Sequence, residues 1–131
     1  MNSGADRLAL RPECPDLPAM SIFAPDGGYR VRITDHSAPH DDNVVEEIGG
    51  FSTLAHANEF ARRYVRASIE ACREPGMSAE EVVSAWLSFG EDASVPDAAE
   101  QGFIGQDVAS LFAHQPPDPD SLNWRILDPR L

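Results

Sequence analysis

The chain has 131 residues, and its ten arginines and no lysine stand against 22 acidic residues, for a formal net charge of −12. The lack of lysine excludes Schiff-base catalysis and the phosphate-binding lysine of a P-loop. The negative charge disfavours nucleic-acid and membrane partners and favours a protein partner with a basic surface. At this length, with 42% apolar residues, we expect a single folded domain.

Prolines concentrate near the two ends of the chain. Their distribution predicts an N-terminal extension over 1–19, one domain over 20–114, and a Pro/Asp-rich C-terminal tail over 115–131. No apolar run reaches the roughly 18 residues that span a bilayer. The first residues also lack the basic and apolar regions of a secretory signal, so we expect a cytoplasmic protein.

Three strands are predicted in the first half of the chain. The clearest is Tyr29–Asp35, where apolar and polar residues alternate without interruption. Ser21–Ala24 precedes it across a turn rich in glycine, and Val44–Ile48 follows it across a polar loop. Because both connections are too short for a crossover, they predict a three-stranded antiparallel meander.

A long helix is predicted next. Leu54–Arg73 contains no glycine or proline, its apolar residues recur at helical spacing, and Thr53 can cap its first turn. Cys72 falls on the apolar side of this helix and is predicted to be a buried free thiol. Cys14 lies between prolines and is predicted to be exposed.

Two shorter helices complete the prediction. The sequence from Ser78 to Glu81 is a capping box that opens a helix ending at Gly90. Gly105–His114 can form a further short helix that buries its apolar residues. The fold class is therefore α+β, a three-stranded antiparallel meander packed against one long and one or two shorter helices.

The segment from Tyr29 to Val95 resembles a family of small bacterial proteins with no established activity. The shared features are the Tyr-x-Val-x-Ile strand, an acidic loop with histidine, and Gly-Gly-Phe before the long helix. The stretches P-G-M-S-A-E-E (75–81) and F-G-E-D (89–92) follow in the same order. The resemblance implies this order of elements and no particular activity.

The loop after Tyr29–Asp35 is the strongest candidate for metal chemistry. Imidazole and carboxylate groups are ligands for Zn²⁺ and other divalent ions. This loop places five such residues close together: Asp35, His36, His40, Asp41 and Asp42. An acidic, solvated connection between strands explains the same composition, and Pro39 opposes the helix on which an H-x₃-H spacing would share a face.

Two further groups are candidate partner-binding residues. Glu91 and Asp92 follow a predicted helix end, where the helix dipole disfavours negative charge; they are either exposed acids after a C-cap or residues held there for a site. The tail carries the apolar residues Leu122, Trp124, Ile126 and Leu127, which can pack on a partner or on their own domain.

The sequence contains no set of residues typical of a nucleophilic or phosphate-binding enzyme. It therefore favours a non-enzymatic binding or accessory protein that acts on a protein partner and needs no cofactor. One alternative is a metal-binding protein, including a metal-dependent enzyme, that uses the loop from His36 to Asp42. A second is a DNA mimic that inhibits a DNA-binding protein. Homodimerisation through an open edge strand is a further expectation.

Overall fold

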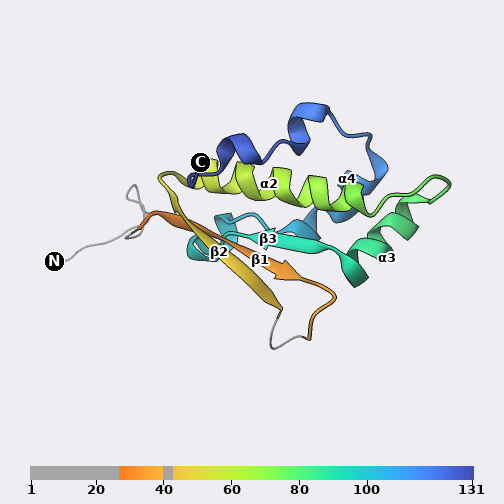
Figure 1. The fold of residues 1–131 in the computed structure, drawn as a ribbon, viewed down its shortest axis with the longest axis horizontal. Helices are drawn as coiled ribbons and strands as arrows, with labels where there is room; N and C mark the ends of the chain where they lie inside the picture. The colour runs from red at the N-terminus through yellow and green to blue at the C-terminus, as the bar shows by residue number, and fades with distance from the viewer. Residues whose placement is uncertain (1–26, 40–42) are drawn as a thin grey trace.

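The computed structural model describes residues 27–39 and 43–131, apart from the side chain of Ala99. In this part of the chain a three-stranded antiparallel sheet packs against helices, and the predicted α+β class is confirmed (Figure 1). The strands are β1 (Tyr29–Asp35), β2 (Val44–Phe51) and β3 (Glu91–Ser94). The α-helices are α2 (Leu54–Ala71), α3 (Ala79–Phe89) and α4 (Ala109–His114). The 3₁₀ helices are η3 (Pro96–Gln101), η4 (Gly105–Asp107), η5 (Pro119–Leu122) and η6 (Arg125–Leu127).

The sheet has the order β2-β1-β3, with β1 in the centre. The alternation in β1 works as predicted: Val31 and Ile33 are fully buried, while Arg30 lies on the opposite, solvated side. β2 forms an edge of the described sheet, and Val44 and Val45 on it are half-exposed. Homodimerisation through this edge stays a prediction.

The third strand of the sheet is not the one predicted from the sequence. Ser21–Ala24 lies outside the described residues. The strand that pairs with β1 is β3, whose Glu91 to Ser94 face Asp35 to Arg32 in antiparallel register. β3 follows α2 and α3 in the chain, so the third strand of the sheet comes from a segment that is distant from β1 and β2 in the sequence. Its four residues, Glu-Asp-Ala-Ser, show no alternation of apolar and polar side chains.

Local capping signals fix the two longer helices. The Thr53 hydroxyl accepts a hydrogen bond from the His56 amide at 3.1 Å, which starts α2 as predicted. α2 ends at Ala71, two residues before the predicted end. In α3 both hydrogen bonds of the capping box are formed, and Gly90 is its C-cap. The predicted third helix is divided into η4 and α4, which meet at Val108.

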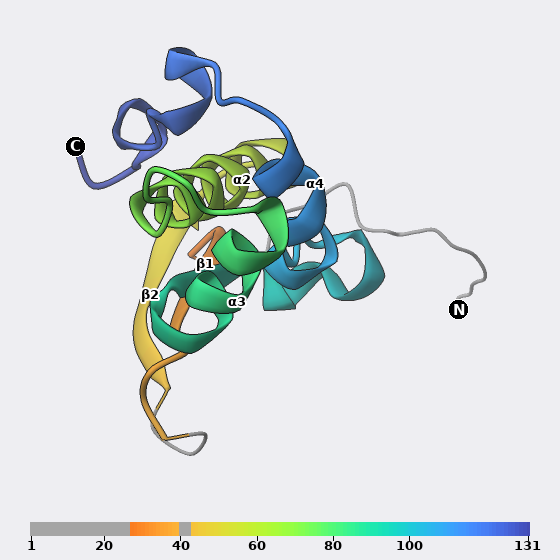
Figure 2. The same cartoon turned by 90° about the vertical axis from the view of Figure 1, so that its right-hand side faces the viewer.

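The hydrophobic core lies between the sheet, α2 and α3. α2 contributes Phe60, Val65 and Ile69, and α3 contributes Trp86, all with no exposed surface. Figure 2 looks onto the α3 end of the molecule, where α3 and α4 lie on the same side of α2. No helix in the described ranges is long and apolar enough to cross a membrane.

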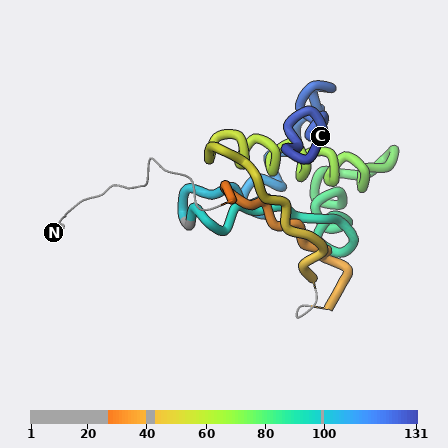
Figure 3. The backbone as a smooth tube through the Cα atoms, turned by 60° about the vertical axis from the view of Figure 1, so that its left-hand side comes forward, coloured from red at the N-terminus to blue at the C-terminus, as the bar shows by residue number. Residues whose placement is uncertain are grey.

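The C-terminal tail folds back along α2 (Figures 1 and 3). Trp124 packs against Phe60 and Tyr64, with ring centroids 5.6 and 5.0 Å apart. The His56 ring nitrogen lies 2.6 Å from the Leu127 carbonyl oxygen, and the Arg63 guanidinium donates to the Asn123 carbonyl at 3.2 Å. These contacts place the tail against the side of α2 that faces away from the sheet.

Candidate functional site: a groove between α2 and α3

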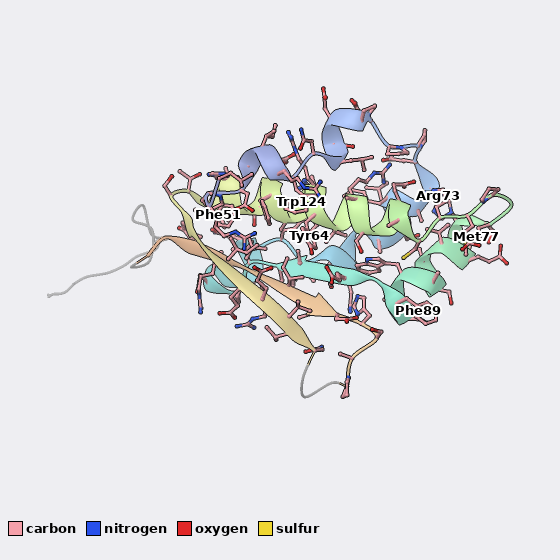
Figure 4. All side chains as sticks on the ribbon, in the orientation of Figure 1. Phe51, Tyr64, Arg73, Met77, Phe89 and Trp124 are labelled. Carbon is pink, nitrogen blue, oxygen red and sulfur yellow. The ribbon has the colours of Figure 1, made fainter. Side chains whose placement is uncertain are left out.

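A groove of about 710 Å³ lies beside the C-terminal half of α2. Small side chains at helical spacing on α2 line it: Ala67, Ser68, Ala71 and Cys72. Tyr64 and Trp124 line it near the middle of α2, and Met77 and Phe89 line it near α3 (Figure 4). Small residues between larger ones leave room for an apolar side chain or segment to lie close to the helix.

Cys72 is half-buried at the C-cap of α2 and lines this groove, so it is less buried than the predicted buried free thiol. Its thiol is free. Burial raises the pKa of the Cys72 thiol, so the reactive thiolate form is disfavoured. We therefore treat Cys72 as part of the apolar lining. Cys14 lies outside the described residues.

Glu91 is the polar residue held most firmly in the groove. Its side chain accepts a hydrogen bond of 2.5 Å from the Tyr64 hydroxyl. Its backbone amide donates to the Ser68 hydroxyl at 3.0 Å, and its carbonyl accepts from the Trp86 indole at 3.2 Å. Burial, followed by the hydrogen bond to Glu91, raises the pKa of the Tyr64 hydroxyl, so that hydroxyl stays a donor. Three side chains from two helices, α2 and α3, thus hold Glu91 in position.

Phe89 is the most exposed large apolar side chain at the groove, with 76% of its surface accessible. Its spacing from the buried residues Val82 and Trp86 is helical and would place it on the same face of α3. The helix ends at Phe89, and the chain turns at Gly90 into β3. Phe89 therefore lies beyond the covered face of α3 (Figure 4). An exposed aromatic ring at the rim of an apolar groove is typical of an interaction surface.

Among the described residues, both charged residues that line the groove are acidic. Glu74 and Glu91 are the charged residues that line it. No described arginine is among the lining residues: Arg30 and Arg32 pair with Glu47, Arg63 with Glu59, Arg73 with Glu70, and Arg130 with Glu46 and Asp128, while Arg125 lies over the ring of Trp124. The groove thus combines apolar surface with carboxylates that no arginine of the described chain neutralises.

Comparison with known proteins adds no relative. No family model matches the chain, and no match was found among curated proteins or solved structures. The family resemblance of the segment from Tyr29 to Val95 stays a prediction, and the residues of the groove carry the functional argument.

The four apolar tail residues that were predicted to bind a partner lie in different environments. Trp124 lines the groove, while Leu122 and Leu127 are half-buried on the tail that packs along α2. Ile126 is 69% exposed. A role of these four residues in partner binding stays a prediction, and Trp124 is the member that the groove includes.

Asp92 is buried, with 7% of its surface exposed, which corrects the interpretation of Glu91 and Asp92 as two exposed acids after a helix end. Its carboxylate accepts a hydrogen bond from the Ala93 amide at 2.8 Å. The backbone of Gly105, which packs directly against this carboxylate, also favours its ionised form. Burial outweighs these contacts and raises the pKa of Asp92.

Asp92→Asn is expected to match or exceed the wild-type stability at pH 7. Because the folded-state pKa is raised, ionised Asp92 destabilises the folded protein, and this cost is relieved as the pH falls through the folded pKa. Asparagine keeps an oxygen acceptor without the charge, so its advantage should shrink in acid. Urea unfolding between pH 7 and pH 4 measures this.

Asp92→Ala is the matched variant for Asp92→Asn. It removes the acceptor of the Ala93 amide and should be about 1–3 kcal/mol less stable than Asp92→Asn at every pH, because that amide is left unpaired while neither variant carries the charge. A wild-type protein that is clearly more stable than Asp92→Asn at pH 7 would show instead that the charge itself stabilises the fold.

The predicted metal loop is only partly described. His40, Asp41 and Asp42 lie outside the described residues. The Asp35 carboxylate accepts from both the amide and the hydroxyl of Ser37, at 2.8 and 2.7 Å. The His36 ring packs edge-on against Trp86, 4.7 Å between centroids, and its buried Nε2 atom has no hydrogen-bond partner within the described ranges.

In the part of the chain that the structure describes, no three His, Cys, Asp or Glu residues are grouped to hold a metal ion. Metal binding by the five residues of the loop therefore stays a prediction.

Proposed function

We propose that this protein is a small non-enzymatic binding protein, and that it holds an apolar and basic segment of a protein partner in the groove between α2 and α3. The observation that carries the proposal is Phe89, exposed by 76% at the rim of an apolar groove in which both charged lining residues of the described chain are carboxylates. An isolated soluble domain gains nothing from exposing a phenylalanine at such a place, whereas a docked partner would bury it.

The charge of the whole chain supports the same partner chemistry. A net charge of −12 attracts a basic surface over distances beyond direct contact and speeds encounter. Glu74 and Glu91 continue this negative field into the groove itself. The partner segment is therefore expected to carry lysine or arginine beside its apolar side chains. The metal-binding and DNA-mimic alternatives do not account for the exposed apolar surface of the groove.

Phe89→Ser tests this proposal. The tagged full chain, its Phe89→Ser variant and a Leu111→Ser control are used to capture partners from the lysate of the source organism, and a recovered partner is then purified for a binary binding measurement. We expect Phe89→Ser to weaken the binary affinity at least about tenfold, as for an aromatic anchor at the centre of an interface. Rising salt should weaken it further.

Leu111 is a suitable control because it is an exposed apolar residue on α4, outside the groove lining. Leu111→Ser should leave the binary affinity within about twofold of wild type. Equal affinities for wild type and Phe89→Ser, or an affinity that salt does not change, would contradict the proposal.

A further inference from the structure

The Glu91 carboxylate is half-buried and still lacks a cationic partner within the described ranges. Among the described residues, six other carboxylates each pair with an arginine: Glu46, Glu47, Glu59, Glu70, Asp97 and Asp128. Glu91 instead accepts one hydrogen bond from a neutral phenol. A carboxylate partly removed from water is stabilised most by a cation that donates a hydrogen bond to it.

The position of the Glu91 carboxylate is determined before any ligand arrives. The Tyr64 hydroxyl binds Oε1, and the backbone on either side of the Cα atom is held by Ser68 and by Trp86. The Oε2 atom makes no hydrogen bond to the described residues and is left to accept from a ligand. A preorganised acceptor loses little side-chain entropy on binding, which favours affinity at this point of the groove.

The surroundings of Glu91 suit the stem of a basic side chain. The ring of Tyr64 lies beside the carboxylate, and Ala67 and Ala71 provide a low apolar surface along α2. Lysine and arginine place their methylene groups on such surface while the charged end reaches a polar partner. The guanidinium of Arg125 lies over the Trp124 ring, 4.5 Å from its centroid. Because this indole face is already occupied by a cation, we place the charge of the ligand at Glu91.

We propose that Glu91 is the specificity-determining residue of the groove, which binds a lysine or arginine side chain of the partner with its charge at the Glu91 carboxylate and its stem against Tyr64 and the small residues of α2. This inference rests on the proposed function, because it assigns the residue that selects the basic component of the bound segment. The neighbouring Glu74 is exposed and adds to the field without a fixed position.

A pair of small probes tests the role of Glu91. Phenylbutylamine and phenylbutanol share an apolar body and differ in the terminal charge. Each is titrated into the ¹⁵N-labelled full chain, and the amide shifts of residues 64–74 and 89–91 are followed. We expect the amine to bind about fivefold more tightly than the alcohol, as for one partly exposed charge-assisted contact. In Glu91→Gln this preference should disappear while the alcohol binds as before.

Glu100→Gln controls for the loss of net charge. Glu100 is exposed and lies outside the groove lining, so this variant changes the charge equally and should keep the preference for the amine. Glutamine at 91 retains an oxygen that can accept from Tyr64, which favours an unchanged fold. Equal binding of the two probes to the wild-type protein would overturn the assignment even if a variant fails to fold.

The outcomes separate this inference from the proposed function. Equal binding of amine and alcohol to the wild type, or a preference retained by Glu91→Gln, overturns the assignment of Glu91 and leaves the apolar groove intact. If neither probe shifts the groove amides, or if Phe89→Ser leaves both affinities unchanged, the groove itself is not the binding site and the proposed function fails with it.

Discussion

Gly90→Ala is expected to lower the free energy of unfolding by about 3 kcal/mol, as in a severe case of overpacking. A Cβ atom at Gly90 would overlap the indole of Trp86, lying 2.8 Å from Nε1 and 2.9 Å from Cγ. Trp86 is fully buried, and its indole donates to the Glu91 carbonyl, so the ring has no free space to move into. Urea unfolding followed by tryptophan fluorescence measures the loss.

Gly49→Ala is the matched control for this substitution. A Cβ atom at Gly49 would meet only the Gly27 carbonyl oxygen at 3.7 Å and the Arg30 Cγ atom at 4.0 Å, which are ordinary contacts. Its stability should stay within about 0.5 kcal/mol of wild type. If both variants lost the same stability, the close approach of Gly90 to Trp86 could not be the cause.

Gly90 also connects the fold to the groove. It is the C-cap of α3, it lines the groove, and it directly precedes Glu91. The absence of a Cβ atom lets α3 pass into β3 within one residue while Trp86 stays beneath the turn. A shift of this turn would displace Glu91 from Tyr64, so Gly90→Ala should weaken ligand binding as well as stability.

Elements governed by local signals could be predicted from the sequence. β1 follows from its alternation of apolar and polar residues, and α3 follows from a capping box whose members lie three residues apart. The signal for α2 was equally clear, and only its last two residues differ. In each of these elements, neighbours in sequence provide the contacts that define the structure.

β3 could not be predicted because its stability comes from distant segments. Asp92 is buried against the backbone of Gly105, and Ala93 pairs with Ile33 of β1. An Asp in a short polar segment is ordinarily exposed, so nothing local indicated a strand. The sequence drew attention to Glu91 and Asp92 through their unfavourable position after a helix. The structure buries Asp92 there, while a role of the two residues in partner binding stays a prediction.

The groove escaped prediction for a related reason. The groove is lined by one face of α2, which includes Tyr64, Ala67 and Ala71. How much of this face is exposed depends on where α3 and the tail pack against α2. By its spacing, Phe89 would lie on the buried face of α3. It is exposed because the chain turns into β3 directly after it. Helical periodicity identifies which residues share a face, but it does not indicate where the covering element ends.

Deleting residues 121–131 is expected to lower the free energy of unfolding by about 4 kcal/mol. The deletion removes Trp124 from its contacts with Phe60 and Tyr64 and exposes Phe60, which is now fully buried. It also removes the acceptors of His56 and Arg63 on the tail, whereas the exposed pair between Arg130 and Glu46 contributes little. Thermal and urea unfolding of the truncated chain measure this effect.

Two single substitutions show which part of the tail matters. Trp124→Ala should lose about 2 kcal/mol, because half-buried aromatic packing on α2 is lost. Ile126→Ala is the control, since Ile126 is exposed and should change stability by less than about 0.5 kcal/mol. If the deletion and Trp124→Ala both left stability unchanged, the tail would not be held on α2 in solution. Trp124 would then be free to bind the partner directly, as the sequence alone had allowed, and the groove would lose one of its walls.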